Sequence, residues 1–156
     1  MGDKNMREQS GRSLIEIIGV LAIGAIMVSG TYAIYNSTNQ KQKRFIAGAT
    51  LENIATKTKT MLEYSGYGPV SVDFLIESGA ITSDKAPAGG KGWSVTSSID
   101  GTEFSINLVD LSYEECVYFA TKKLDWATHI SVNGFSSGDT SYCLKTGSNN
   151  MSFFAK

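Results

Sequence analysis

The sequence has few of the residues that most often carry out chemistry or hold metal ions. It contains one histidine, two cysteines and two prolines among 156 residues. No spacing typical of a zinc site can be made from so few ligands. Charge of one sign is also not in excess, because 14 lysines and arginines face 15 aspartates and glutamates. This balance argues against a protein that mainly binds nucleic acid, since such proteins usually carry a clear basic excess.

The sequence also lacks the motifs of a catalytic site. His129 is a lone histidine in a segment with the pattern of a strand, where packing or surface exposure is the commoner role. No nucleophile motif such as GxSxG is present. The loop Gly89–Gly92 lacks both the spacing of a phosphate-binding loop and the Ser/Thr-led helix that follows one. Asp100 and Asp139 adjoin glycines, so we interpret them as turn residues rather than calcium ligands. We expect no enzyme activity, no cofactor and no metal site.

What the chain does have is one long apolar segment. Residues 14–35 read LIEIIGVLAIGAIMVSGTYAIY and contain a single charge, that of Glu16, and no proline. As a helix rising about 1.5 Å per residue, this segment would reach ~33 Å, which is enough to cross the apolar part of a bilayer. The sequence therefore predicts a membrane-spanning helix.

The start of this apolar segment has two unusual residues. The preceding segment, MGDKNMREQSG, is polar and ends at the small residue Gly11. Glu16 lies inside the apolar run, where a carboxylate costs at least about 2.5–3.5 kcal/mol on insertion scales. Cleavage after Gly11 would create an amine on Arg12 that could pair with such a carboxylate. An uncleaved signal anchor is the simpler alternative, but it explains neither Gly11 nor Glu16.

The segment GRSLIE, followed by about 20 apolar residues, resembles the class III signal of type IV pilins and pseudopilins. In that family a membrane aspartyl peptidase, the prepilin peptidase, cuts after the glycine and methylates the new N-terminus. The resemblance places cleavage at Gly11 and methylation at Arg12. It also implies that Glu16 pairs with the N-terminal amine of a neighbouring subunit during assembly. The family usually begins its mature chain with an apolar residue, and Arg12 departs from this.

The resemblance divides the chain into three parts. Residues 1–11 would be the leader, residues 12–35 the transmembrane or filament-core helix, and residues 36–156 the periplasmic head. The helix is predicted to continue as an amphipathic segment to about Tyr64 and to end before Gly66, Gly68 and Pro69. The apolar residues of this second half recur at helical spacing: Ala47, Leu51, Ile54 and Met61 or Leu62. We interpret Lys41, Lys43 and Arg44 as a solvated face of the helix.

The rest of the head is predicted to be an antiparallel sheet that packs on this helix. Two alternating segments flank Asp100 and Gly101 and predict a hairpin. Their apolar-side positions are Trp93, Val95, Ser97 and Ile99 in one strand and Phe104, Ile106 and Leu108 in the other. Asp73–Ser78 is expected to form a short helix, and residues 86–92 a loop. Further short strands are expected at His129–Val132, Tyr142–Leu144 and Met151–Ala155.

Ser112–Glu115 has the pattern of a capping box, which predicts a second helix to about Leu124. Cys116 lies in this helix, and Cys143 follows 27 positions later. In an exported chain we expect the two cysteines to form a disulfide, which would add roughly 3–4 kcal/mol of stability on the chain-entropy model. Two buried free thiols are the alternative. Residues 133–150, rich in Ser, Gly and Asn, are interpreted as a solvated loop.

Together these features predict an α+β protein with a long N-terminal helix as its spine. Two cysteines near the C-terminus resemble the family as a whole. The helix that holds Cys116, the C-terminal strand, the 11-residue leader and the start at Arg12 resemble type IVb pilins more than type IVa pilins. The expected function is that of a filament subunit, with other copies of itself, the prepilin peptidase, an assembly platform and the inner membrane as partners. A minor pilin or a pseudopilin of a secretion or DNA-uptake machine is the nearer alternative. A signal-anchored periplasmic binding or enzymatic domain is the more distant one.

Overall fold

The computed structural model describes residues 18, 35, 38–88 and 90–156. By its contacts the chain divides into two compact units, Met1–Lys41 and Gln42–Lys156. The second unit holds an antiparallel sheet, two short helices, a 3₁₀ turn and most of a longer helix, which runs over residues 38–62. Among the residues described, no helix is both long and apolar enough to cross a membrane. The apolar segment 14–35 lies almost wholly outside them.

The 38–62 helix buries one face in the core of the second unit. Ala47, Leu51, Ile54 and Leu62 are each at most 4% exposed, as their spacing predicts. Of the two residues considered for its last position, Leu62 is the buried one and Met61 is 43% exposed. The buried stripe also includes Thr58, which is fully buried. Its hydroxyl donates to the Ile54 carbonyl at 2.8 Å, and this bond makes a polar residue tolerable in the apolar face.

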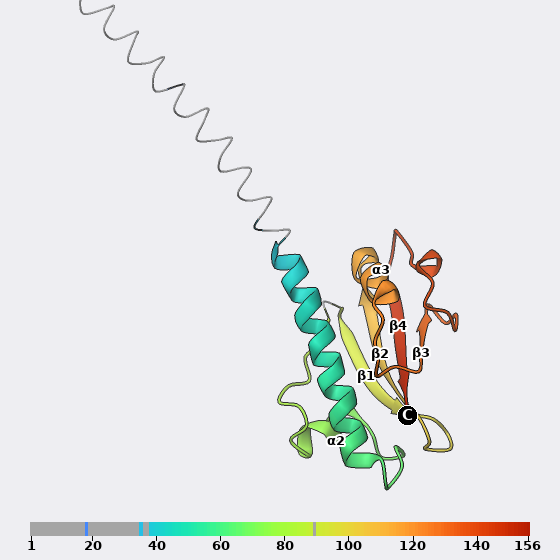
Figure 1. Ribbon diagram of the computed structural model, residues 1–156. Helices are drawn as coiled ribbons and strands as arrows, with labels where there is room; N and C mark the ends of the chain where they lie inside the picture. The colour runs from blue at the N-terminus through green and yellow to red at the C-terminus, as the bar shows by residue number, and fades with distance from the viewer. Residues whose placement is uncertain (1–17, 19–34, 36–37, 89) are drawn as a thin grey trace, which may run out of the picture. The chain divides into compact units, whose positions relative to one another are not determined.

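The sheet has four antiparallel strands in the order β1-β2-β4-β3. Figure 1 shows β1 (Gly92–Ser97), β2 (Phe104–Leu111), β3 (His129–Val132) and β4 (Asn149–Ala155). The predicted hairpin is present, with Val95 opposite Ile106 and Ser97 opposite Phe104. Its turn is longer than two residues. Ile99 belongs to this turn and is fully exposed, so its predicted place in the strand is wrong.

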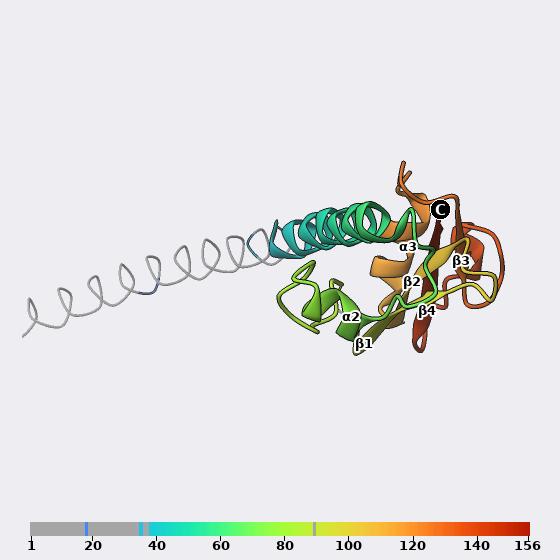
Figure 2. The same ribbon diagram turned by 90° about the horizontal axis from the view of Figure 1, so that it is seen from below.

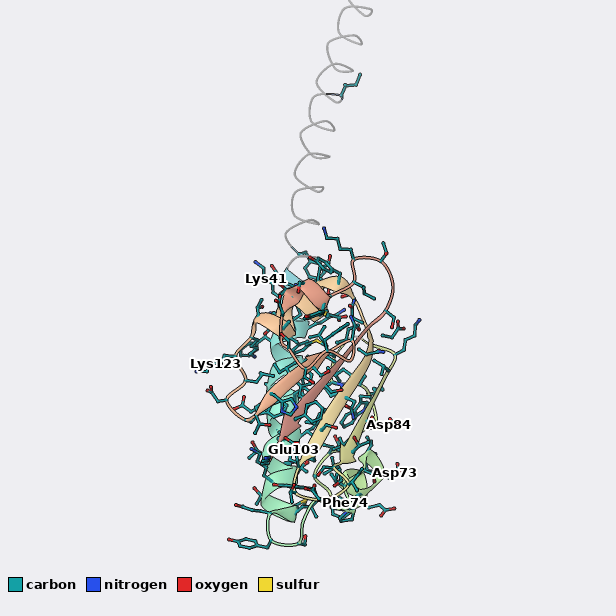
Figure 3. The ribbon with its side chains drawn as sticks, turned by 90° about the vertical axis from the view of Figure 1, so that its right-hand side faces the viewer. Lys41, Asp73, Phe74, Asp84, Glu103 and Lys123 are labelled. Carbon is teal, nitrogen blue, oxygen red and sulfur yellow. A yellow bond between two sulfur atoms is a disulfide. The ribbon has the colours of Figure 1, made fainter. Side chains whose placement is uncertain are left out.

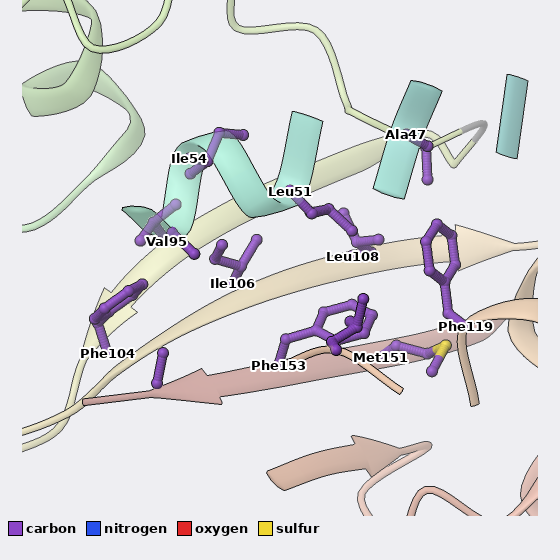
Figure 4. Packing of buried hydrophobic residues seen from close by; sticks show 14 of the residues in the cluster. Ala47, Leu51, Ile54, Val95, Phe104, Ile106, Leu108, Phe119, Met151 and Phe153 are labelled. Carbon is purple, nitrogen blue, oxygen red and sulfur yellow. The ribbon is translucent and has the colours of Figure 1, made fainter. Parts of the chain in front are cut away.

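Both the 38–62 helix, from Gln42 onward, and α3 (Tyr113–Thr121) pack on the same face of the sheet (Figures 1 and 2). Figure 4 shows Ala47, Leu51 and Ile54 of the helix above Val95, Ile106 and Leu108 of the strands. Phe119 of α3 meets Phe153 of β4 edge to face at 5.8 Å, so α3 covers the other half of this face. The fold is therefore α+β with helices in one layer and the sheet in the other.

The two short helices begin at side-chain caps. In α2 (Val72–Glu77), the Ser71 hydroxyl accepts a hydrogen bond from the Phe74 N–H. In α3 the capping box is formed as predicted. However, α3 ends at Thr121, earlier than expected, because Lys122 already has an extended backbone. Leu124 nevertheless remains buried, beyond the end of the helix.

The predicted strand Tyr142–Leu144 is wrong. The chain there forms a 3₁₀ turn, η1 (Thr140–Tyr142), which begins where Asp139 accepts a hydrogen bond from the Ser141 N–H. Both backbone groups of Leu144 bond to the side chain of Asn149 rather than to a strand. A side-chain amide thus takes the place of a ladder partner.

Candidate functional site

The residues predicted to act in processing and assembly, Gly11, Arg12 and Glu16, lie outside the described residues. The other predicted pair, Cys116 and Cys143, does form a disulfide. Their Cα atoms are 5.9 Å apart and both residues are buried. The alternative of two free thiols is therefore wrong, and no thiol remains to act as a nucleophile with His129. The disulfide fastens α3 to the segment that leads into β4.

The side chain of a buried asparagine, Asn149, also anchors the segment that follows the disulfide. Asn149 is fully buried at the start of β4. Its Oδ1 accepts from the Leu144 N–H at 2.7 Å and from the Asn133 amide at 3.0 Å. Its Nδ2 donates to the carbonyls of Leu111, at 3.3 Å, and Leu144, at 3.1 Å. All four hydrogen bonds of the amide are made within the protein, so Asn149 fixes the segment after the disulfide to the end of β2.

Asn133 extends this network into the turn after β3. It has a positive φ of 51° and precedes Gly134 at φ 86°. Its side chain donates to the Tyr142 carbonyl at 2.7 Å and accepts from the Asn150 N–H at 2.8 Å. Interpreting residues 133–150 as a solvated loop missed these bonds. The dipeptide Asn-Gly, a strong signal for a tight hairpin turn, could have indicated the turn, whereas nothing local marks Asn149 as buried.

Arg44 also differs from its predicted role. Its guanidinium lies 3.6 Å from the Glu114 carboxylate at the start of α3, and its side chain is only 23% exposed. The Nε atom is buried without a hydrogen-bond partner. Arg44 therefore links the 38–62 helix to α3 instead of lying on a solvated face. Lys43 remains exposed, as expected.

His129 packs against an aromatic ring at the edge of the sheet. Its imidazole stacks on Phe154 with ring centres 4.1 Å apart and planes within 8°. Its Nδ1 lies 3.9 Å from Glu103 Oε1, which also accepts from the Thr128 hydroxyl at 3.1 Å. Beside His129 is a hollow of about 490 Å³, which is lined by lysines and serines but by no carboxylate. One of these lysines, Lys123, is labelled in Figure 3. The described contacts of His129 are thus ring stacking on Phe154 and a longer approach to the Glu103 carboxylate.

Two carboxylates at the ends of the hairpin strands are held in their charged form. The pKa of Asp100 falls from 3.8 to about 2, chiefly because the Ser98 hydroxyl donates to it at 2.6 Å. A hydrogen bond from Lys91, whose Nζ lies 2.7 Å from Asp110, lowers the pKa of the Asp110 carboxyl. The same contact raises the pKa of Lys91. Each shift arises from a turn or strand-end contact and leaves the group charged at neutral pH.

In the part of the chain that the structure describes, no three histidine, cysteine, aspartate or glutamate side chains gather as metal ligands would. In comparisons with known proteins, no family model matches the chain and no curated sequence matches it. The contacts described join a helix, a sheet and a C-terminal segment through a disulfide, an asparagine network and an ion pair.

Proposed function

We propose that this chain is the structural subunit of a filament of the type IV pilus kind, similar to type IVb pilins. In this proposal residues 1–11 are removed, and residues 12–35 first span the bacterial inner membrane with the head in the periplasm. The same helix then packs with its copies in the filament core. The proposal rests on the sequence of the N-terminal segment, GRSLIE and the apolar run, together with the kind of head that follows it.

The observation that supports it best is the helix over residues 38–62. From Gln42 onward one side of this helix is buried against the sheet, and Leu51 and Ala55 are fully buried. A head built around the second half of a helix, whose first half would be the apolar run, suits a subunit that polymerises through that run. The disulfide fits a head that folds in an oxidising compartment.

Substitution of Glu16 tests the assembly role. Glu16→Ala would remove the carboxylate that pairs with a neighbour's amine, so we expect surface filaments to fall about tenfold or more, because a charge pair in apolar surroundings is strongly favoured over an unpaired amine. Membrane insertion should be unchanged, because alanine is apolar. Sheared filaments and membrane fractions from the native host would be compared by immunoblotting.

Glu8→Ala, in the segment expected to be removed, is the matched control and should assemble normally. Filaments from Glu16→Ala at the level of the unaltered chain would contradict the assembly role. Mass spectrometry of the mature N-terminus should find Arg12 as the first residue, and a retained Met1 would contradict processing. If sheared filaments contain only traces of the chain, a minor pilin or pseudopilin is the better assignment.

A further inference from the structure

A hollow of about 300 Å³ lies between the 38–62 helix and the segment that joins α2 to β1. Figures 1 and 2 show this segment passing beside the helix. One contact fastens the two walls, because the Lys57 ammonium donates to the Ala80 carbonyl at 2.7 Å. Ligand sites usually have volumes of about 300–1,000 Å³. The hollow therefore suits a small ligand, or the end of a larger one.

Part of the lining of this hollow is apolar. The half-buried side chains of Ile81, Pro87 and Trp93 contribute to it. The indole of Trp93 is held in place, since its Nε1 donates to the Asp84 carbonyl at 2.6 Å. Among the residues described, no other aromatic ring is paired with this indole. A flat apolar group could therefore pack against it.

Two ammonium groups line the same hollow, and no carboxylate does. Lys57 uses one of its three donors on Ala80, so two remain for a ligand. Lys85 forms no ion pair with any residue that the structure describes. Its backbone is fixed by the Ser83 hydroxyl, which accepts from the Lys85 N–H at 3.1 Å. A cleft lined by charge of one sign attracts ions of the opposite sign, so this hollow favours an anion.

The carboxylate that adjoins Lys85 in the sequence does not neutralise it. Asp84 lines a second hollow, of about 510 Å³, together with Lys85, Lys91 and Trp93. Its carboxylate forms an ion pair with neither lysine, and Lys91 pairs instead with Asp110 at 2.7 Å. Lys85 thus borders both hollows without an ionic partner in the described part of the chain.

We infer that the hollow between the helix and the α2–β1 segment binds an organic carboxylate with a flat apolar body. The body would lie against Trp93 and Pro87, and the carboxylate would accept hydrogen bonds from Lys85 and Lys57. A neutral apolar ligand would leave both ammonium groups unused, and an inorganic anion would leave the apolar side chains unused. The carboxylate can belong to a free acid or to the C-terminus of a peptide. This binding does not depend on whether the chain forms filaments.

A chemical-shift titration of the full chain, labelled with ¹⁵N and held in detergent micelles, tests the inference with phenylacetate. We expect millimolar binding that shifts the indole N–H of Trp93 and the backbone N–H of Lys85. Phenylacetamide has the same shape but no charge, so it should bind about fivefold or more weakly. Raising the salt from about 0.05 M to 0.5 M should weaken the binding of phenylacetate, because salt screens charge contacts.

A peptide that ends in phenylalanine separates the two sources of the carboxylate. If the peptide binds more tightly than phenylacetate, and its C-terminally amidated form does not, the ligand is a chain end. If the peptide binds more weakly than phenylacetate, the ligand is a small acid.

Lys85→Gln should weaken the binding of phenylacetate about threefold to fivefold, because it removes one charge at an exposed position. Lys123→Gln is the matched control, since Lys123 is also exposed but lines the hollow beside His129. Its binding should equal that of the unaltered chain. Equal effects of the two substitutions, equal binding of phenylacetate and phenylacetamide, or no shift of the Trp93 indole N–H would overturn the inference. Spectra of Lys85→Gln that are unchanged away from the hollow would show that the variant is folded.

Discussion

At the scale of single residues, the Asn149 amide makes the hydrogen bonds with Leu144 that a neighbouring strand would otherwise make. Its amide supplies the acceptor and the donor that Leu144 lacks, and it reaches the Leu111 carbonyl as well. Because the side chain is fully buried, water cannot replace these bonds when the amide is removed. The residue is therefore a point at which a small change affects the whole C-terminal segment.

We expect Asn149→Ala to lower the free energy of unfolding by roughly 2–4 kcal/mol, because several buried backbone groups would lose their partners. Urea denaturation of the two proteins would measure the difference. Asn150→Ala is the control. Asn150 is exposed and its Oδ1 accepts one bond from the Asp110 N–H at 3.2 Å, so its loss should cost about 1 kcal/mol or less. Equal costs for both substitutions would contradict the role given to Asn149.

The Asp100 carboxyl makes the free energy of unfolding depend on pH in the acid range. Its pKa is about 2 in the folded chain, against 3.8 without the hydrogen bonds of the turn. The unfolded chain therefore binds the proton first, so the contribution of Asp100 is complete above about pH 4 and is lost as the pH falls toward 2. Asp100→Asn should flatten the decline of the urea midpoint across this range. Ser98→Ala, which removes the largest cause of the shift, should flatten it too, and an unchanged decline in both would contradict the assignment.

At the scale of elements, α3 is stabilised by the capping box at its first turn. The Ser112 hydroxyl accepts from the Glu115 N–H at 3.3 Å, and the Ser112 N–H donates to the Glu115 carboxylate at 2.9 Å. Ser112→Ala should lower the free energy of unfolding by about 1 kcal/mol. Thr at position 112 keeps the acceptor, so Ser112→Thr should cost less, as thermal unfolding would show. An equal loss in both proteins would mean that the cap is not the cause.

Elements built by neighbouring residues could be predicted from the sequence. The capping box, β3, the hairpin and α2 each follow from signals within a few positions of one another. How residues 140–144 fold could not be predicted, because side chains outside this segment, those of Asn133 and Asn149, supply its hydrogen-bond partners. The contact of Arg44 with Glu114 joins residues 70 positions apart, and the bond from Asn149 to Leu111 joins residues 38 apart. For Gly11, Arg12 and Glu16 the sequence alone supports the prediction.

At the scale of the whole molecule, the disulfide joins the middle of the head to its C-terminal segment. Replacement of both cysteines, by Cys116→Ser and Cys143→Ser together, should lower the free energy of unfolding by roughly 3–4 kcal/mol on the chain-entropy model. Urea denaturation with and without a reducing agent would measure this for the unaltered chain. The reduced chain and the double variant should then agree. No change on reduction would show that the Asn149 network suffices without the covalent link.

The strand order also sets the time at which the head can fold. β4 is the last strand along the chain, yet it lies between β2 and β3. Until residue 155 has been synthesised, β3 has no strand to pair with, and the side of β2 away from β1 is open. Earlier segments can form only the hairpin and the helices, which expose apolar surface. The four-stranded sheet is therefore completed only after β4 has been synthesised, so the last of its strands to appear limits its folding.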